Sequence, residues 1–84
     1  MVEHLDYEEP ITGVAERIRA MVKVVVADER TFSPLSTGER IAVALVLDRH
    51  DLLQRAWGSA LEAVDRLGPV WTAAALRVQR HGWS

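Results

Sequence analysis

The sequence predicts an all-α fold, a compact bundle of four helices over residues 10–29, 37–48, 51–67 and 69–80. Apolar residues recur with a period near 3.6 in the first and third segments, as on one face of a helix. A capping-box pattern precedes the second segment, and Gly68-Pro69 separates the third from the fourth. Residues 1–9 are expected to form an acidic tail, and residues 10–84 a single helical domain.

The first predicted helix, residues 10–29, begins at Pro10, whose missing N–H costs nothing in a first turn. One face of this helix collects the apolar residues Ile11, Val14, Ala15, Ile18, Met21, Val22, Val25 and Val26. The run Val24–Val26 has strand propensity, but the helical period is kept across four turns. We therefore predict a helix here.

Ser36 and Glu39 have the spacing of a capping box, in which each side chain accepts a hydrogen bond from the backbone N–H of the other residue. The helix that follows, residues 37–48, contains the run Ile41–Leu47, which is apolar on every side. A helix of that kind is expected to be surrounded by other helices. We predict that this apolar second helix is the buried centre of the fold.

The apolar pattern is interrupted at Asp48–Asp51, where we place a break, although one bent helix over residues 37–67 also fits. The helix at 51–67 has the most regular apolar face, made of Leu52, Leu53, Ala56, Trp57, Ala60, Leu61, Val64 and Leu67. Gly68 and Pro69 end it and start the helix at 69–80. Ala73 and Leu76 lie on the outer side of that last helix, which a four-helix monomer is not expected to cover.

Composition excludes several classes of protein. The 84 residues make one small domain with a formal net charge of −2, and cysteine is absent, so disulfides and thiol chemistry are excluded. The N-terminal segment is acidic where a signal peptide is basic, and no apolar run reaches the ~18 residues of a membrane span. We expect a soluble cytoplasmic protein with no membrane contact.

Residues 35–45 resemble the signature segment of ABC-type ATPases, through Leu35-Ser36-Thr37-Gly38-Glu39-Arg40 and Val43-Ala44-Leu45. In that family, Ser and Gly backbone groups at a helix N-terminus contact the γ-phosphate of ATP. This chain has Thr37 where Gly is usual, and it lacks the Gly-Lys-Ser/Thr of a phosphate loop. We therefore predict a structural cap without ATP hydrolysis, and anion binding at Ser36–Arg40 stays a hypothesis to test.

Asp48, His50 and Asp51 carry groups that bind metals, and a histidine can act as a general base. Neighbouring positions at a helix junction seldom converge on one point, so a solvated turn is the favoured interpretation. The sequence contains no Ser-His-Asp arrangement and no helix motif with paired carboxylates. We predict that the protein is not an enzyme and binds no cofactor or metal.

The predicted function is a non-catalytic interaction module that binds a protein partner or associates with itself, and a homodimer is one form that self-association can take. The small size of the domain and the uncovered side of the last helix motivate this prediction. The predicted contact surface consists of Ala73, Leu76, Arg77, Arg80 and Trp83. The alternative is weak nucleic-acid binding through Arg66, Arg77, Arg80 and Trp83. It is less favoured because a nucleic-acid footprint normally makes the whole domain basic.

Overall fold

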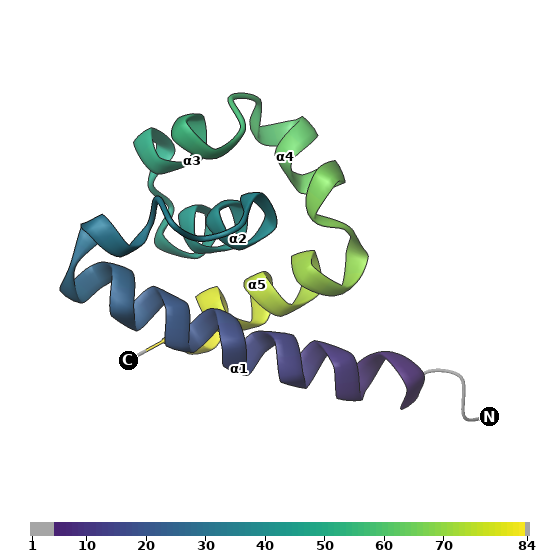
Figure 1. The fold of residues 1–84 in the computed structure, drawn as a ribbon. Coiled ribbons are helices and arrows are strands. Elements are labelled where there is room, and N and C mark those ends of the chain that lie inside the picture. Colours follow the sequence, from purple (N-terminus) through teal and green to yellow (C-terminus); the bar gives the residue numbers. More distant parts are fainter. Residues whose placement is uncertain (1–4, 84) are drawn as a thin grey trace.

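The structure, a computed structural model, describes residues 5–83, with side chains from residue 8 onward. Its elements are α1 (Leu5–Ala27), the 3-10 turn η1 (Glu29–Thr31), α2 (Thr37–Leu47), α3 (His50–Ala56), α4 (Ala60–Leu67) and α5 (Pro69–His81). No strand occurs within residues 5–83, so the all-α prediction is confirmed. In Figure 1, α2 lies between α3 and α4 on one side and α1 and α5 on the other, and it contacts all four.

The first helix is longer at its start than predicted. α1 begins at Leu5, so Pro10 lies inside the helix rather than at its first position. Acidic side chains near a helix N-terminus are favourable, and Glu8 also pairs with Arg77 of α5 at 3.2 Å. The predicted start at residue 10 is therefore wrong, while residues 1–4 of the expected tail lie outside the described part of the chain.

The end of α2 shows why residues 37–67 do not form one bent helix. Asp48 adopts the left-handed conformation, with φ of 54°, and its N–H donates to the carbonyl of Leu45 at 3.1 Å. The N–H of Arg49 donates to the carbonyl of Ala44 at 3.0 Å. These bonds close the last turn of α2 and redirect the chain, so the break at Asp48–Asp51 is confirmed.

The segment predicted as one helix over residues 51–67 is two helices, and the four-helix count is therefore wrong. α3 ends at Ala56, and Gly58 has φ of 106°, a conformation that glycine adopts with little strain. Ser59 then caps α4, since its hydroxyl accepts a hydrogen bond from the N–H of Glu62 at 3.4 Å. The spacing of Ser59 and Glu62 repeats that of Ser36 and Glu39, and it is the sequence signal for this second helix start.

The core is apolar throughout the described side chains, and α2 is its largest contributor. The buried residues are Ala15, Ile18, Val22, Val25, Phe32, Ile41, Ala42, Val43, Ala44, Val46, Leu52, Leu53, Ala63, Leu67, Ala74, Ala75 and Val78. Leu45 and Leu47 of α2 are only half-buried and line grooves at the surface. The prediction that other helices surround α2 on every side is thus not confirmed.

The start of α2 carries both hydrogen bonds of a capping box. The N–H of Glu39 donates to the Ser36 hydroxyl at 3.3 Å, and the N–H of Ser36 donates to the Glu39 carboxylate at 2.9 Å. Ser36→Ala should lower the free energy of unfolding by about 1 kcal/mol, because one of these acceptors is lost. Urea denaturation followed by circular dichroism measures this change. Ser36→Thr keeps the hydroxyl and serves as the control, and unchanged stability of Ser36→Ala would contradict a stabilising role for the cap.

Gly13 and Gly58 should respond in opposite ways to the same substitution. An added Cβ would meet no atom within 4 Å at either position, so the backbone conformation decides the outcome. Gly13→Ala, in the exposed interior of α1, should raise the free energy of unfolding by about 0.5–1 kcal/mol. Gly58→Ala should lower it by about 1–2 kcal/mol, because φ of 106° is strained for any residue with a Cβ. The same urea experiment compares them, and a shared sign would contradict the separation of α3 from α4.

Candidate functional site

The most exposed large apolar side chain among the described residues belongs to α4. This helix buries Ala63 and Leu67, which form one edge of its apolar face. The other edge is left in solvent, where Leu61 is 83% exposed and Val64 is 36% exposed. The predicted apolar face of residues 51–67 is therefore interrupted, because the break at Gly58 gives α4 an orientation different from that of α3.

The outer side of α5 continues this apolar surface. Val64 of α4 lines one shallow groove with Leu61, and a neighbouring groove with Ala73 and Leu76 of α5. Leu76 is 43% exposed, and Ala73 is half-buried. We call the surface made of Leu61, Val64, Ala73 and Leu76 the α4–α5 strip. It contains the two apolar residues that the sequence predicted to be uncovered, and it adds two from the predicted apolar face of residues 51–67.

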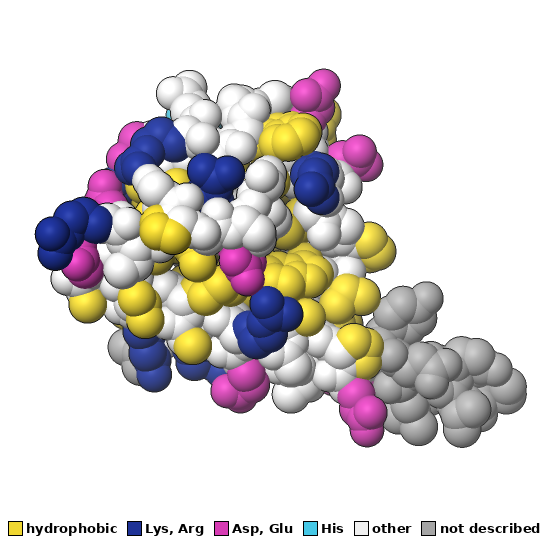
Figure 2. All heavy atoms as spheres, viewed as in Figure 1, with side chains coloured by type: hydrophobic (Ala, Val, Ile, Leu, Met, Phe, Trp, Pro, Cys, Tyr) yellow, Lys and Arg dark blue, Asp and Glu magenta, His cyan; other side chains and the backbone are white. Residues whose placement is uncertain are grey.

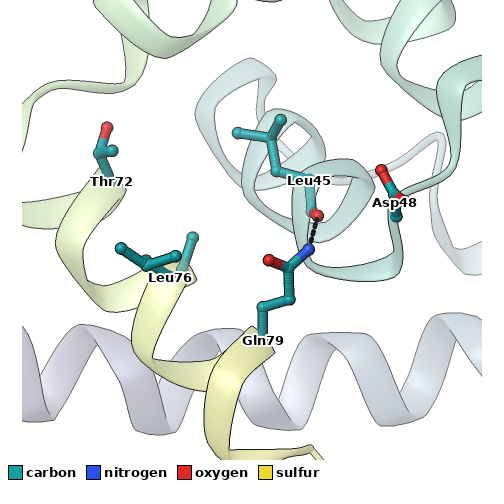
Figure 3. Close-up of a pocket in the computed structure, with 6 residues that line it drawn as sticks. Leu45, Asp48, Thr72, Leu76 and Gln79 are labelled. Atoms are coloured by element: carbon teal, nitrogen blue, oxygen red, sulfur yellow. Dashed lines mark hydrogen bonds between the residues drawn. The ribbon is translucent and has the colours of Figure 1, made fainter.

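A further groove of about 270 Å³ adjoins the strip where α5 packs on α2. Figure 3 shows Thr72, Leu76 and Gln79 on α5 and Leu45 and Asp48 on the α2 side of this groove, with Gln79 reaching the backbone of Leu45. The Gln79 amide Nε2 donates to the backbone carbonyl of Leu45 at 3.0 Å. The amide nitrogen of Gln79 is therefore already bonded, and the rest of the groove lining is mainly apolar.

Charged residues mark the two ends of the strip. Asp65 lies beside Val64 and Pro69 in the groove between α4 and α5. Arg80 is exposed on α5, four residues after Leu76 and hence one turn further along the same side of the helix. The strip is therefore apolar in the middle, acidic at one end and basic at the other.

The other residues of the predicted contact surface lie elsewhere. Arg77 turns toward α1, where its guanidinium donates to Thr12 at 3.2 Å and to Glu8 at 3.2 Å. Trp83 is half-buried and packs against the core. Arg66 of α4 lies over the ring of Trp57, 5.9 Å from its centroid. The basic side chains near the C-terminus are thus dispersed over several neighbours, which sequence order alone does not reveal.

The three tryptophans lie in different environments. Trp57, which belongs to the predicted apolar face of residues 51–67, is 43% exposed because it stands at the end of α3 where the chain breaks. Trp71 is half-buried against the core, and Arg17 lies 5.4 Å from its ring centroid. Figure 2 shows hydrophobic side chains near the middle of the visible face of the molecule, with Lys or Arg side chains beside them. Arg17, which also pairs with Glu39 at 3.1 Å, therefore covers part of the Trp71 ring.

The proposed anion position at Ser36–Arg40 already holds a carboxylate. Glu39 accepts from the N–H of Ser36, and this hydrogen bond is the main cause of its lowered pKa. The Arg40 guanidinium donates a hydrogen bond to the Thr37 hydroxyl at 3.4 Å. An anion at this helix start would meet the charge of Glu39, so the geometry gives the anion hypothesis no added support.

The junction of α2 and α3 forms an ion-pair cluster. Arg49 donates to Asp51 at 2.7 Å and 2.9 Å, and to Glu29 at 3.2 Å. His50 is exposed, and the described residues contain no group of three or more metal-binding side chains. Of the two carboxylates considered for a metal, Asp51 is therefore engaged by arginine.

Comparisons with known proteins add no assignment. No protein-family model matches this sequence, and no curated protein or solved structure is significantly similar to it. Over residues 5–83, none of the helices has both the length and the apolar character needed to cross a bilayer.

Arg49 makes the stability of the α2–α3 junction depend on pH. Its hydrogen bonds lower the pKa of Asp51 from 3.8 to about 2. A carboxylate with a depressed pKa in the folded state stabilises the fold above its unfolded pKa and loses that effect as the pH falls through the folded value. Asp51→Asn should therefore flatten the loss of stability between about pH 4 and pH 2.

Urea denaturation at a series of pH values measures this dependence. Arg49→Gln removes the cause of the shift and should flatten the same interval. Wild-type pH dependence in both variants would contradict a contribution from this pair.

Proposed function

We propose that this protein is a non-catalytic protein-interaction module whose contact surface is the α4–α5 strip, with self-association as its leading form. The observation that supports this most directly is the exposure of Leu61 and Val64 on one short amphipathic helix. Burying apolar surface is worth roughly 25 cal/mol per Å². A partner surface that covers the strip would therefore gain free energy that the isolated domain forgoes.

The shape and chemistry of the grooves support a protein partner over a small molecule. Small-molecule sites are usually concave pockets with a few polar groups that converge on the ligand. The grooves along α4 and α5 are shallow and lined mainly by apolar atoms. The Gln79 amide Nε2 already donates to the Leu45 carbonyl, which engages one of the few polar groups that line these grooves. A broad apolar surface with charged residues at its rim is typical of protein interfaces.

A role without catalysis is supported by the state of the chemically active side chains. Asp51 is held by Arg49, and Glu39 is held by the helix start that it caps. His50 stands exposed on α3, away from any cluster of metal-binding side chains in the described residues. Asp51 therefore serves an ion pair and Glu39 a helix cap, which gives a structural reason for these two carboxylates.

Nucleic-acid binding through the C-terminal basic residues has less support. Arg77 is engaged by Glu8, and Trp83 packs against the core. Stacking on a base requires an accessible aromatic face, and phosphate contacts require unpaired cations. Salt-sensitive binding of an oligonucleotide that is lost in Arg77→Ala with Arg80→Ala would reverse this preference.

The proposal predicts that polar residues in the strip weaken self-association. Leu61→Gln with Leu76→Gln should raise the dissociation constant of the self-associated species at least about tenfold, because four leucines leave the contact in a dimer. Sedimentation velocity over a range of protein concentrations measures this constant. Glutamine is nearly as good a helix former as leucine, so the helices should persist.

The matched control is Val24→Thr with Val26→Thr on α1. Both valines are 51% exposed, and neither belongs to the strip. Circular dichroism checks that each variant is folded. Association that is unaffected by the strip variant, or equally weakened by the control, would contradict the proposed surface.

A further inference from the structure

We propose that the partner on the α4–α5 strip is a second copy of this chain, related by a two-fold axis, with the two α5 helices antiparallel and Asp65 of each copy paired with Arg80 of the other. This inference rests on the proposed function and adds the partner and its orientation. It follows from the order of charges along the strip.

The outer side of α5 carries residues at helical spacing, in the order Pro69, Ala73, Leu76 and Arg80. At a rise of 1.5 Å per residue, Arg80 stands about 16 Å along the axis from Pro69. Asp65 lines the same groove as Pro69 and therefore marks the N-terminal end of α5. The acidic and basic ends of the strip are thus separated by roughly the length of one helix.

In a two-fold dimer, the positions of the acidic and basic ends of the strip determine whether the two α5 helices run parallel or antiparallel. In a symmetric dimer the same patch of both copies forms the contact. If residue i of one copy contacts residue j of the other, then residue j of the first copy also contacts residue i of the second. An antiparallel arrangement of α5 centred between Pro69 and Arg80 brings the basic end of one copy to the acidic end of the other. A parallel arrangement would place like charges together, which is unfavourable. The charge order therefore selects the antiparallel form.

The centre of the strip suits a helix crossing. The midpoint between Pro69 and Arg80 falls between residues 74 and 75, close to Ala73 and Leu76 on the outer side. Packed helices approach to about 8–10 Å, with the smaller distances where the contact residues are small. Ala73 allows that approach, and Leu76 supplies apolar area at the crossing. Both are accessible in the single chain.

Asp65 and Arg80 are the charges at the two ends of the strip, while Glu62 lines the groove beside Leu61 and Asp48 lines the groove beside Leu76. The other arginine of α5, Arg77, is engaged by Glu8 at 3.2 Å. Asp65 and Arg80 take part in none of the ion pairs formed among residues 8–83. Pairs at the rim of an interface contribute modest affinity but fix orientation.

The size of the contact predicts a weak dimer. The 13 residues of α5 span about 20 Å, so a single helix pair with the adjoining part of α4 gives a small interface. Interfaces below about 1,200 Å² of total buried area belong to weak or transient complexes. The experiment therefore covers protein concentrations from about 5 µM to 500 µM, where a weak dimer becomes populated.

The test reverses each charge separately and then together. Arg80→Glu and Asp65→Arg should each raise the dissociation constant about tenfold, because two attractive pairs become repulsive in each homodimer. The double variant should return to within about threefold of wild type, since it restores two attractive pairs. In an equimolar mixture of the two single variants, the heterodimer contains two attractive pairs. One joins the introduced glutamate to the introduced arginine, and the other is the native pair of Asp65 and Arg80. The dissociation constant of the mixture should therefore also return to near the wild-type value. Sedimentation velocity at low salt measures all four samples.

Two comparisons separate a local pair from a general charge effect. Lys23→Glu makes the same change of charge as Arg80→Glu on the exposed side of α1, and it should leave the association unchanged. Asp65→Arg brings the formal net charge from −2 to zero, so general repulsion would predict stronger association rather than weaker. Circular dichroism melting confirms that each variant keeps its helices.

The outcomes distinguish this inference from the proposed function. Association that is lost in Leu61→Gln with Leu76→Gln but ignores both charge reversals overturns the antiparallel arrangement and leaves the contact surface standing. Weakening by both single variants without rescue in the mixture also overturns the pairing. A wild-type chain that stays monomeric up to about 500 µM overturns the two-fold dimer and self-association together. Rescue in both the mixture and the double variant supports the arrangement.

Discussion

The fold depends on covering the apolar run of α2 with a chain of only 84 residues. Ile41–Ala44 and Val46 are buried, and α1, α3, α4 and α5 all contribute to covering this helix. A domain of this size has few residues to spare, because its surface is large relative to its volume. Most of the apolar area of the other helices is therefore used to cover α2, and little of the chain is left to cover the outer sides of α4 and α5. The small size of the domain thus explains both the burial of α2 and the exposure of the α4–α5 strip.

Two breaks allow the short helices to follow one another around α2. Asp48 in the left-handed conformation turns the chain from α2 into α3, and Gly58 turns it from α3 into α4. Gly68 and Pro69 then start α5 without a linker. Each break changes which side of the next helix faces the core. In a continuous helix over residues 51–67, Val64 would lie in line with Leu53, and Leu61 would lie at the edge of the same broad apolar face. The break separates that face into two parts with different orientations.

The ion pairs also follow the arrangement of the helices. Most ion pairs include at least one side chain near a helix end, such as Asp51 with Arg49 and Glu39 with Arg17. These pairs are largely exposed, so they contribute less to stability than to the choice of neighbours. Arg77 links α5 to the first turns of α1 through Glu8. Asp65 and Arg80 remain at opposite ends of an apolar surface, and this distribution gives the strip a direction.

The sequence by itself determined the helical class, the cap at Ser36, the break after Leu47 and the start of α5 at Pro69. These features act within a few residues along the chain, so local hydrogen bonding and backbone preference suffice to predict them. The cap at Ser59 has the same local signal, and reading it would have divided residues 51–67 correctly. Only the tertiary structure decided that Trp57 and Leu61 are exposed, that Trp83 packs on the core, and that Arg77 binds Glu8. Exposure and pairing depend on which distant residues come to cover a side chain, and helical periodicity alone does not carry that information.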